Sequence, residues 1–308
     1  MTLYFGYMAL VSGSFHKLAG FAGNLKANTA GQMERVFAFL AHPSETEGSH
    51  IRDVDGFESL EFDNVYFQYP TAGEFVLRGV SFTIRKGEKV SLVGVNGAGK
   101  STIIKLILGL YRISAGTIRL NGYDVNEYDI RDVRRLFSVM FQNYARYSLT
   151  LRECIGLSDT DRLEDVHAMM EAMEKSGVAG FYDRFDSGLD SYVTKQFSDD
   201  GVELSGGQHQ KLALCRTYFK DAPFYIFDEP SAALDAEAED RVLQNFARIS
   251  DGKTGIIISH RLSSSRMTDK VIVLDGGVVV ETGSHEELMS KGGIYAELFT
   301  MQKKKYTL

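Results

Sequence analysis

Hydrophobic positions along the chain alternate between short runs typical of strands and longer repeats typical of helices. The strand-like runs are residues 60–69, 76–84, 89–94, 117–120, 137–141, 224–227 and 255–259. Apolar residues recur at helical spacing in residues 100–111, 163–173 and 286–302. A further run, 271–281, contains a glycine pair and predicts a hairpin. This alternation predicts an α/β fold with a mainly parallel sheet.

The middle of the chain differs from the parts that flank it. Residues 150–220 carry no strand signal, although strand-like runs precede and follow them. Helical spacing is visible inside this stretch, for example in 163–173. We therefore expect a helical subdomain, over residues 143–220, inserted into the sheet-forming part of the chain.

The start of the chain has a character of its own. Residues 1–16 contain no formal charge, and their apolar run, 3–11, is short. A spanning helix needs about 20 apolar residues, and neither the basic front end nor the cleavage site of a secretory signal is present. Apolar residues recur at mostly helical spacing in 21–40, until His42, Pro43 and Ser44 break the pattern. We expect a long helix, then a polar linker, in a chain whose start is the cut end of something larger.

Composition narrows the class of protein. The chain has 308 residues and a mass of 34.3 kDa, with 44% hydrophobic and 24% charged residues, as in ordinary globular proteins. A formal charge of -7 and a pI near 5.6 give no electrostatic footprint for nucleic acid, so we expect no nucleic-acid partner. The two cysteines, Cys154 and Cys215, stand far apart without a metal-binding pattern, which predicts buried thiols.

Residues 94–101, GVNGAGKS, match the phosphate-loop pattern GxxxxGK[ST] between a strand-like run and a helical one. Glycines let successive backbone N–H groups point at phosphate oxygens, and the following helix presents its positive end. Lys100 supplies a charge for the β- and γ-phosphates, in binding and in catalysis, and Ser101 is placed to coordinate Mg²⁺. The residues expected to hold the nucleotide are Gly94, Asn96, Gly97, Ala98, Gly99, Lys100, Ser101 and Thr102.

Residues 224–229, FYIFDE, form an apolar run that ends in two adjacent carboxylates. Ligands of open α/β sheets bind at the carboxyl edge, where such a strand ends. Asp228 is therefore predicted to serve the metal shell, and Glu229 to polarise the water that attacks the γ-phosphate. A simple strand terminus is the alternative when this motif is considered alone.

Residues 204–208, LSGGQ, precede a helical run. Ser205 and the two glycines can stand at the start of that helix as a second anion site, because helix N-termini attract phosphate groups. An ordinary helix N-cap is the alternative. A phosphate loop and a second phosphate-seeking helix end in one chain suggest a site shared between two chains.

These three motifs, in this order, resemble the ATP-binding domain of the ABC transporter superfamily, whose signature sequence is LSGGQ. The resemblance runs from about Phe57 to the end of the chain. It implies a P-loop NTPase core with an antiparallel β subdomain and a helical signature subdomain. On this basis we expect the nucleotide-binding domain at 57–308, a linker at 43–56, and the truncated end of a last transmembrane helix at 1–42.

Five further positions match the family pattern, and four of them have a simpler structural alternative. Tyr69 stands where the family places the aromatic ring that stacks on adenine, and Gln142 where a glutamine joins the Mg²⁺ shell and senses the transmembrane partner. Asp235 matches the loop that crosses to the other nucleotide domain, and His260 the switch histidine at the γ-phosphate. Gly201 lies in a stretch that resembles the loop facing the transmembrane coupling helices. The alternatives are a packing tyrosine, a surface glutamine, a helix cap and a strand-end histidine.

The resemblance implies that ATP is sandwiched between two such domains, with the phosphate loop of one facing the signature of the other. The signature residues expected to bind it are Ser205, Gly206, Gly207 and Gln208. A dimer, of identical or homologous chains, is then required for hydrolysis. Lys211 and Cys215 depart from the usual arginine and alanine, and neither departure bears on catalysis.

We expect an exporter ATPase on the cytoplasmic face of the cell membrane, joined to a transmembrane domain. Residues 33–40 and 43–45 resemble the end of the sixth transmembrane helix and the linker of exporters, and 150–155 resembles exporter sequence. Two alternatives are a separate importer ATPase subunit and a soluble ABC ATPase without transport. The soluble class is disfavoured, because the chain has a single phosphate loop and only roughly a hundred residues separate Gly94 from Ser205. The cargo is not encoded in this part of a transporter.

Overall fold

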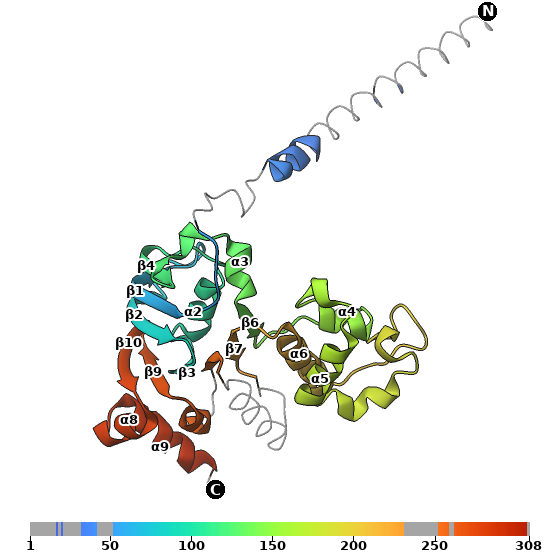
Figure 1. The fold of residues 1–308 in the computed structure, drawn as a ribbon. Coiled ribbons are helices and arrows are strands. Elements are labelled where there is room, and N and C mark those ends of the chain that lie inside the picture. The colour runs from blue at the N-terminus through green and yellow to red at the C-terminus, as the bar shows by residue number, and fades with distance from the viewer. Residues whose placement is uncertain are drawn as a thin grey trace, which may run out of the picture. The chain divides into compact units, whose positions relative to one another are not determined.

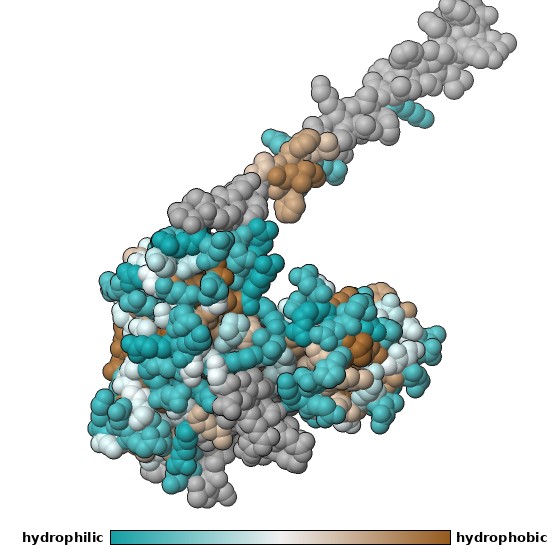
Figure 2. Space-filling model, viewed as in Figure 1, coloured by the Kyte–Doolittle hydropathy of each residue, from teal (hydrophilic) through white to brown (hydrophobic). Residues whose placement is uncertain are grey.

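The structure is a computed structural model that describes residues 17, 20, 32–41, 52–230, 252–258 and 262–306. The chain divides into two units, Met1–Gly48 and Ser49–Leu308. In the first unit, residues 32–40 are helical, within the helix predicted for 21–40. This helix exposes the large apolar side chains Met33, Val36, Phe37, Phe39 and Leu40. Figure 2 shows tan and brown surface on this part of the chain. No helix within the described residues is both long enough and apolar enough to cross a bilayer.

The second unit contains two sheets (Figure 1). The smaller is antiparallel, in the order β2-β1-β4-β5. Its strands are β1 Ser59–Phe67, β2 Leu77–Arg85, β4 Ala115–Leu120 and β5 Tyr123–Asp124. Polar and apolar positions alternate along β1 and β2, because one face of each strand is buried and the other meets solvent. This sheet is the predicted antiparallel β subdomain.

The larger sheet has the order β10-β9-β3-β8-β7-β6. Its strands are β3 Lys89–Val93, β6 Phe137–Met140, β7 Phe224–Asp228, β8 Thr254–Ile258, β9 Lys270–Asp275 and β10 Val278–Gly283. All neighbouring strands are parallel except β9 and β10, which form the predicted hairpin. β7 and β8 are buried along their whole length, which explains their continuous apolar sequences. The predicted fold class, a P-loop core with a mainly parallel sheet, is confirmed.

Helices pack against these sheets and form an insert between β6 and β7. The helices of the core are α2 Lys100–Ile107 and α3 Ile130–Arg135. Those of the insert are α4 Leu151–Gly156, α5 Val166–Ser176 and α6 Gly206–Lys220, with short 3-10 turns. Those after the last strand are α8 His285–Lys291 and α9 Ile294–Tyr306. The predicted single tail helix is thus two helices, because Gly292 adopts a left-handed conformation, with φ 65°, that ends α8.

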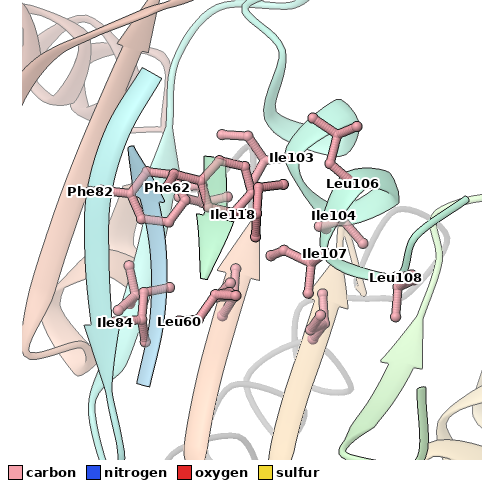
Figure 3. Packing of buried hydrophobic residues seen from close by; sticks show 14 of the residues in the cluster. Leu60, Phe62, Phe82, Ile84, Ile103, Ile104, Leu106, Ile107, Leu108 and Ile118 are labelled. Atoms are coloured by element: carbon pink, nitrogen blue, oxygen red, sulfur yellow. The ribbon is translucent and has the colours of Figure 1, made fainter. Parts of the chain in front are cut away.

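Three hydrophobic clusters include strands of the larger sheet, and two of them enclose β7. In the first, side chains of β1 and β2 meet side chains of α2, as Figure 3 shows for Leu60, Phe62, Ile103 and Ile107. The second fills the helical insert and reaches the sheet at β6, β7 and β8. Along β7 the side chains alternate, so that Phe224 and Ile226 join the first cluster and Tyr225 and Phe227 the second. The strand that ends in Asp228 is therefore held from both faces.

Candidate functional site

The phosphate loop joins β3 to α2 and has the backbone that its glycines were expected to allow. Gly94 lies at φ 157° and Gly97 at φ 81°. A β-carbon on Gly94 would lie 2.2 Å from the carbonyl oxygen of Leu274 in the neighbouring strand, so no larger residue fits there. A β-carbon on Gly97 would meet nothing within 4 Å, so its requirement is conformational and its surroundings leave room for a ligand. Gly99 is the N-cap of α2 and has no side chain to occupy the N–H groups at the helix start.

Lys100 is the first residue of α2, and its side chain reaches back over the loop. Its Nζ donates to the carbonyl oxygens of Gly94 at 2.8 Å and Val95 at 3.0 Å. The residue is 7% exposed. Burial lowers the pKa of its ammonium group, and the negative charges of Glu229 and Asp228 oppose that shift. The structure thus places a cation at the mouth of the loop, facing the acidic end of β7.

Asp228 ends β7 beside the phosphate loop. Burial, aided by the charge of Glu229, raises the pKa of its carboxyl group, and the neighbouring Ser101 hydroxyl, Lys100 and Lys105 oppose that shift. One oxygen, Oδ1, is buried and has no hydrogen-bond partner within the described part of the chain. A buried carboxylate oxygen without a partner is costly unless a cation or donor completes it. The predicted metal residues Ser101 and Asp228 are therefore in contact.

These residues fit a Mg²⁺ ion. Magnesium is held by one or two protein ligands together with substrate phosphates, not by a dedicated cage of side chains. In the described ranges, no group of three or more His, Cys, Asp and Glu side chains is placed to hold a metal. One carboxylate with an uncompensated oxygen, one hydroxyl and an adjacent phosphate loop match the mode that magnesium uses.

Glu229 follows Asp228 in a left-handed backbone conformation, with φ 52°. Its backbone N–H donates to the carbonyl of Ile258 at 2.9 Å, which ties it to β8. Its Oε2 accepts a hydrogen bond of 2.5 Å from Nε2 of Gln142, which follows the end of β6. The structure therefore brings together the two residues assigned to water activation and to sensing, which are 87 positions apart in sequence.

Tyr69 lies beside the first turn of α2. Its hydroxyl is 3.0 Å from Oγ1 of Thr102, another predicted nucleotide contact. Its ring meets those of Phe67 and Tyr111 edge-on, with centroids 4.8 and 5.1 Å away, and Nζ of Lys105 lies 5.3 Å from its centroid. The ring is half-buried and packs as the simpler alternative requires. Its stacking on adenine stays a prediction.

The signature sequence begins α6. Ser205 is the N-cap, and Ser205 and Gln208 form a capping box: the N–H of Ser205 donates to Oε1 of Gln208 at 2.9 Å, and the N–H of Gln208 donates to Oγ of Ser205 at 3.3 Å. Arg184 donates to the same Oε1 at 3.2 Å. Gly206 is exposed, and Gly207 is half-buried. The motif is thus a true helix cap, and its role toward a second chain's nucleotide stays a prediction.

Comparison with known proteins identifies this arrangement. Residues 77–232 match the model of the family described as ABC transporter. The chain belongs to the ABC transporter family. The match includes the phosphate loop, the LSGGQ helix cap and the acidic end of β7.

Several ABC proteins are similar to the chain. It is 38% identical over 267 residues to the subtilin transport ATP-binding protein SpaT of Bacillus subtilis, covering 86% of this chain and 43% of that protein. It is 35% identical to an ATP-dependent lipid A-core flippase of Burkholderia thailandensis, over 87% of this chain and 44% of the flippase. A bacterial Atm1-family ABC exporter with ATP bound superimposes with a TM-score of 0.79 at 30% identity, over 88% of this chain and 46% of that one. The chain therefore spans less than half the length of these relatives.

Two residues that the ABC resemblance assigned to the site, Asp235 and His260, lie outside the described residues. Gly201 is buried, and a β-carbon there would lie 2.0 Å from the carbonyl oxygen of Thr194. This close approach explains the glycine without reference to a partner. Asn96 is exposed in the loop and Ala98 is buried beneath it.

Sequence reasoning missed two residues that connect the motifs of this ABC domain. The hydroxyl of Tyr144 donates to the carbonyl of Gly206 at 3.1 Å, linking the segment after Gln142 to the signature. Nε2 of Gln210, a residue 1% exposed, donates to the carbonyl of Pro230, next to Glu229, at 2.5 Å. Neither residue lies inside a motif, and only the spatial arrangement reveals them.

A groove of about 500 Å³ opens next to the segment after Gln142. It is lined by the segment that follows α2, by β6, by residues of 143–147 and by one side of α6. Two apolar side chains at its wall, Leu110 and Leu157, are 47% and 44% exposed. The groove therefore lies where the core and the helical insert meet, and its lining includes Phe141 and Asn143, the two chain neighbours of Gln142.

Proposed function

We propose that this chain is the ATP-hydrolysing domain of an ABC exporter. The observation that supports this most is the cluster at the end of β7, where Asp228 meets Ser101 and Lys100 while Glu229 meets Gln142. The curated relatives described above are named for transport or flipping, and the superimposed structure is an exporter. Their functions support export for this chain, and the cargo is not specified by the residues of this domain.

In the proposed reaction, the N–H groups of residues 94–101 hold the triphosphate. The ammonium group of Lys100 exchanges its hydrogen bonds to the loop carbonyls for hydrogen bonds to the β- and γ-phosphates. Ser101 and Asp228 would hold Mg²⁺, with Gln142 joining them. When bound, Mg²⁺ neutralises charge on the β- and γ-phosphate oxygens. Glu229 accepts the proton of the attacking water, and Gln142 orients the Glu229 carboxylate.

The same proposal includes a second nucleotide domain, from an identical or a homologous chain. Ser205, Gly206, Gly207 and Gln208 stand at an exposed or half-exposed helix start, where N–H groups attract a phosphate. Asp235 and His260 are assigned to the crossing loop and to the γ-phosphate, as the family pattern implies. Residues 1–42 are proposed as the end of a membrane span, 43–56 as the linker and 57–308 as the nucleotide domain, on the cytoplasmic face of the membrane. The exposed apolar residues of helix 32–40 support the first assignment.

The membrane part is proposed to dock in the groove beside residues 143–147. The exposed apolar residues at its wall, and the groove's nearness to Gln142, support this position. An importer ATPase subunit would instead meet its membrane part as a separate polypeptide. Co-purification of a distinct permease chain would favour that alternative.

The proposal is tested by changing Glu229→Gln. The amide cannot accept the proton of the attacking water, so we expect ATP turnover to fall by about 100-fold or more while Mg-ATP still binds. Size-exclusion chromatography with Mg-ATP should show a stable dimer for this variant. Glu58→Gln, which changes an exposed carboxylate paired with Lys86 and outside the nucleotide-binding motifs, serves as the matched control. Turnover by Glu229→Gln equal to that of the parent would refute Glu229 as the base.

A further inference from the structure

The groove beside residues 143–147 has an unbalanced charge. Three cationic side chains line it, from α3 and α6: Arg134, Arg216 and Lys220. Among the described residues that line it there is no Asp or Glu. An occupant of this groove therefore meets positive charge on a partly apolar wall.

Two of these cations are used within the fold. Nε of Arg134 donates to the carbonyl of Leu108 at 3.0 Å, near the end of α2. Nζ of Lys220 donates to the carbonyl of Arg134 at 2.9 Å, and Asp159 lies near enough to act on it electrostatically. Both side chains thus hold the groove's framework together.

Arg216 is different. One of its terminal nitrogens donates to the carbonyl of Ala145 at 3.2 Å, and its guanidinium lies 5.3 Å from the ring centroid of Tyr147. Its Nε is buried and has no hydrogen-bond partner in the described ranges. Burial lowers its pKa, and the described groups that oppose this shift, Cys154, Tyr147 and Cys215, include no carboxylate.

An N–H group of a guanidinium that is buried without an acceptor loses hydration that nothing replaces. Its planar fork of donors matches a carboxylate better than any other protein group. We propose that the groove's occupant brings an Asp or Glu side chain that pairs with Arg216 beside Tyr147, together with apolar side chains that cover Leu110 and Leu157. This rests on the proposed function, because the occupant is the cytoplasmic face of the transporter's membrane part.

The pairing would also connect the occupant, through hydrogen bonds of the groove wall, to residues of the proposed ATP site. The wall segment that holds Ala145 and Tyr147 against Arg216 also contains Tyr144, whose hydroxyl bonds to the signature at Gly206. It follows directly after Gln142, which bonds to Glu229. A carboxylate that binds Arg216 therefore fixes a segment that is hydrogen-bonded to the LSGGQ signature and lies next to the residue that contacts Glu229.

The test uses the transporter assembled with its membrane part. A photoreactive p-benzoylphenylalanine at Leu157, on the exposed wall, should crosslink to the membrane part, and mass spectrometry should identify a segment that contains an Asp or Glu. Arg216→Gln should lower the crosslinking yield on the order of 30-fold, since truncating one partner of a buried charge pair weakens association strongly. Arg135→Gln, which removes an exposed arginine paired with Asp132 and outside the groove, should leave the yield unchanged.

Folding is checked separately. Mg-ATP binding and the melting temperature of Arg216→Gln should stay close to those of the parent, and Arg216→Glu combined with Lys at the identified acid should restore crosslinking. A crosslinked segment without an acidic residue, or an Arg216→Gln yield equal to the parent's, overturns the pairing while leaving the proposed function intact. A parent chain that never associates with a membrane part overturns both.

Discussion

At the scale of single residues, the central feature is the buried carboxylate of Asp228. Burial raises its pKa, so the folded chain holds its proton more tightly than the unfolded chain does. Stability from this group is present at low pH and is lost as the pH rises through the folded-state pKa. At neutral pH the ionised group therefore destabilises the ligand-free fold, which a bound cation would relieve.

We expect Asp228→Asn to raise the melting temperature of the ligand-free domain at pH 7, because a neutral amide has a smaller desolvation cost at the same site. Each kcal/mol gained corresponds to about 2–4 °C for a domain of this size. The gain should shrink as the pH is lowered, and the further rise that Mg-ATP produces in the parent should be absent. Scanning calorimetry from pH 5 to 8 checks this, with exposed Asp186→Asn as the control. A variant less stable than the parent at pH 7 would contradict the argument.

At the scale of elements, the helical insert and the core are connected by hydrogen bonds between segments far apart in sequence. Tyr144, after β6, bonds to the first residue of α6, 62 positions away. Gln210, within α6, bonds to the residue that follows Glu229. The LSGGQ helix is thus attached at one end to the segment after Gln142 and at one side to the end of β7.

Removing the first of these attachments should affect turnover more than binding. Tyr144→Phe deletes only the hydroxyl that donates to Gly206. One hydrogen bond contributes about 1 kcal/mol, so we expect ATPase activity to fall severalfold. Mg-ATP affinity and melting temperature should change little. Tyr182→Phe, in the same subdomain, is a suitable control because Tyr182 packs at the edge of its hydrophobic cluster. Steady-state kinetics would show the effect in kcat, and an effect confined to KM would argue against it.

The elements also show what could be predicted from the sequence. The phosphate loop, the end of β7 and the LSGGQ cap are contiguous stretches, so their residue spacing was sufficient to predict the local structure. β5, with two residues, and α3, with six, are too short for periodicity to reveal. The contacts of Tyr144, Gln210 and Arg216 depend on how distant segments pack, which no spacing in one sequence encodes. The roles of the site residues stay predictions.

At the scale of the whole nucleotide unit, β7 lies between two hydrophobic clusters. Phe227 belongs to the cluster that fills the helical insert, while its neighbour Ile226 belongs to the cluster beneath α2. A substitution on one face of β7 should therefore alter the stability of the sheet as well as that of the insert. Figure 2 shows mostly polar side chains over the described surface on the face in view, as expected when apolar residues are gathered in such cores.

We expect Phe227→Ala to lower the free energy of unfolding by about 3–5 kcal/mol, because it leaves a cavity beside the strand that carries Asp228. Hydrogen exchange should rise in both α5 and α2. Met169→Ala removes a side chain that is equally buried but lies within the insert, so exchange should rise mainly in α5. If Phe227→Ala left the protection of α2 unchanged, the two clusters would not be coupled through β7.

Glu229 sits in a conformation that suits a glycine better than any residue with a side chain. Holding a β-carbon there costs roughly 1–2 kcal/mol, so selection for a sturdier fold alone would tend to replace this glutamate. A glutamate at this position fits the proposed role of its carboxylate in turnover, a role that nucleotide binding alone would not require. On that proposal, a related chain with glycine here would have a relaxed backbone and no base for hydrolysis, and this substitution would mark an ATP site that binds without turnover.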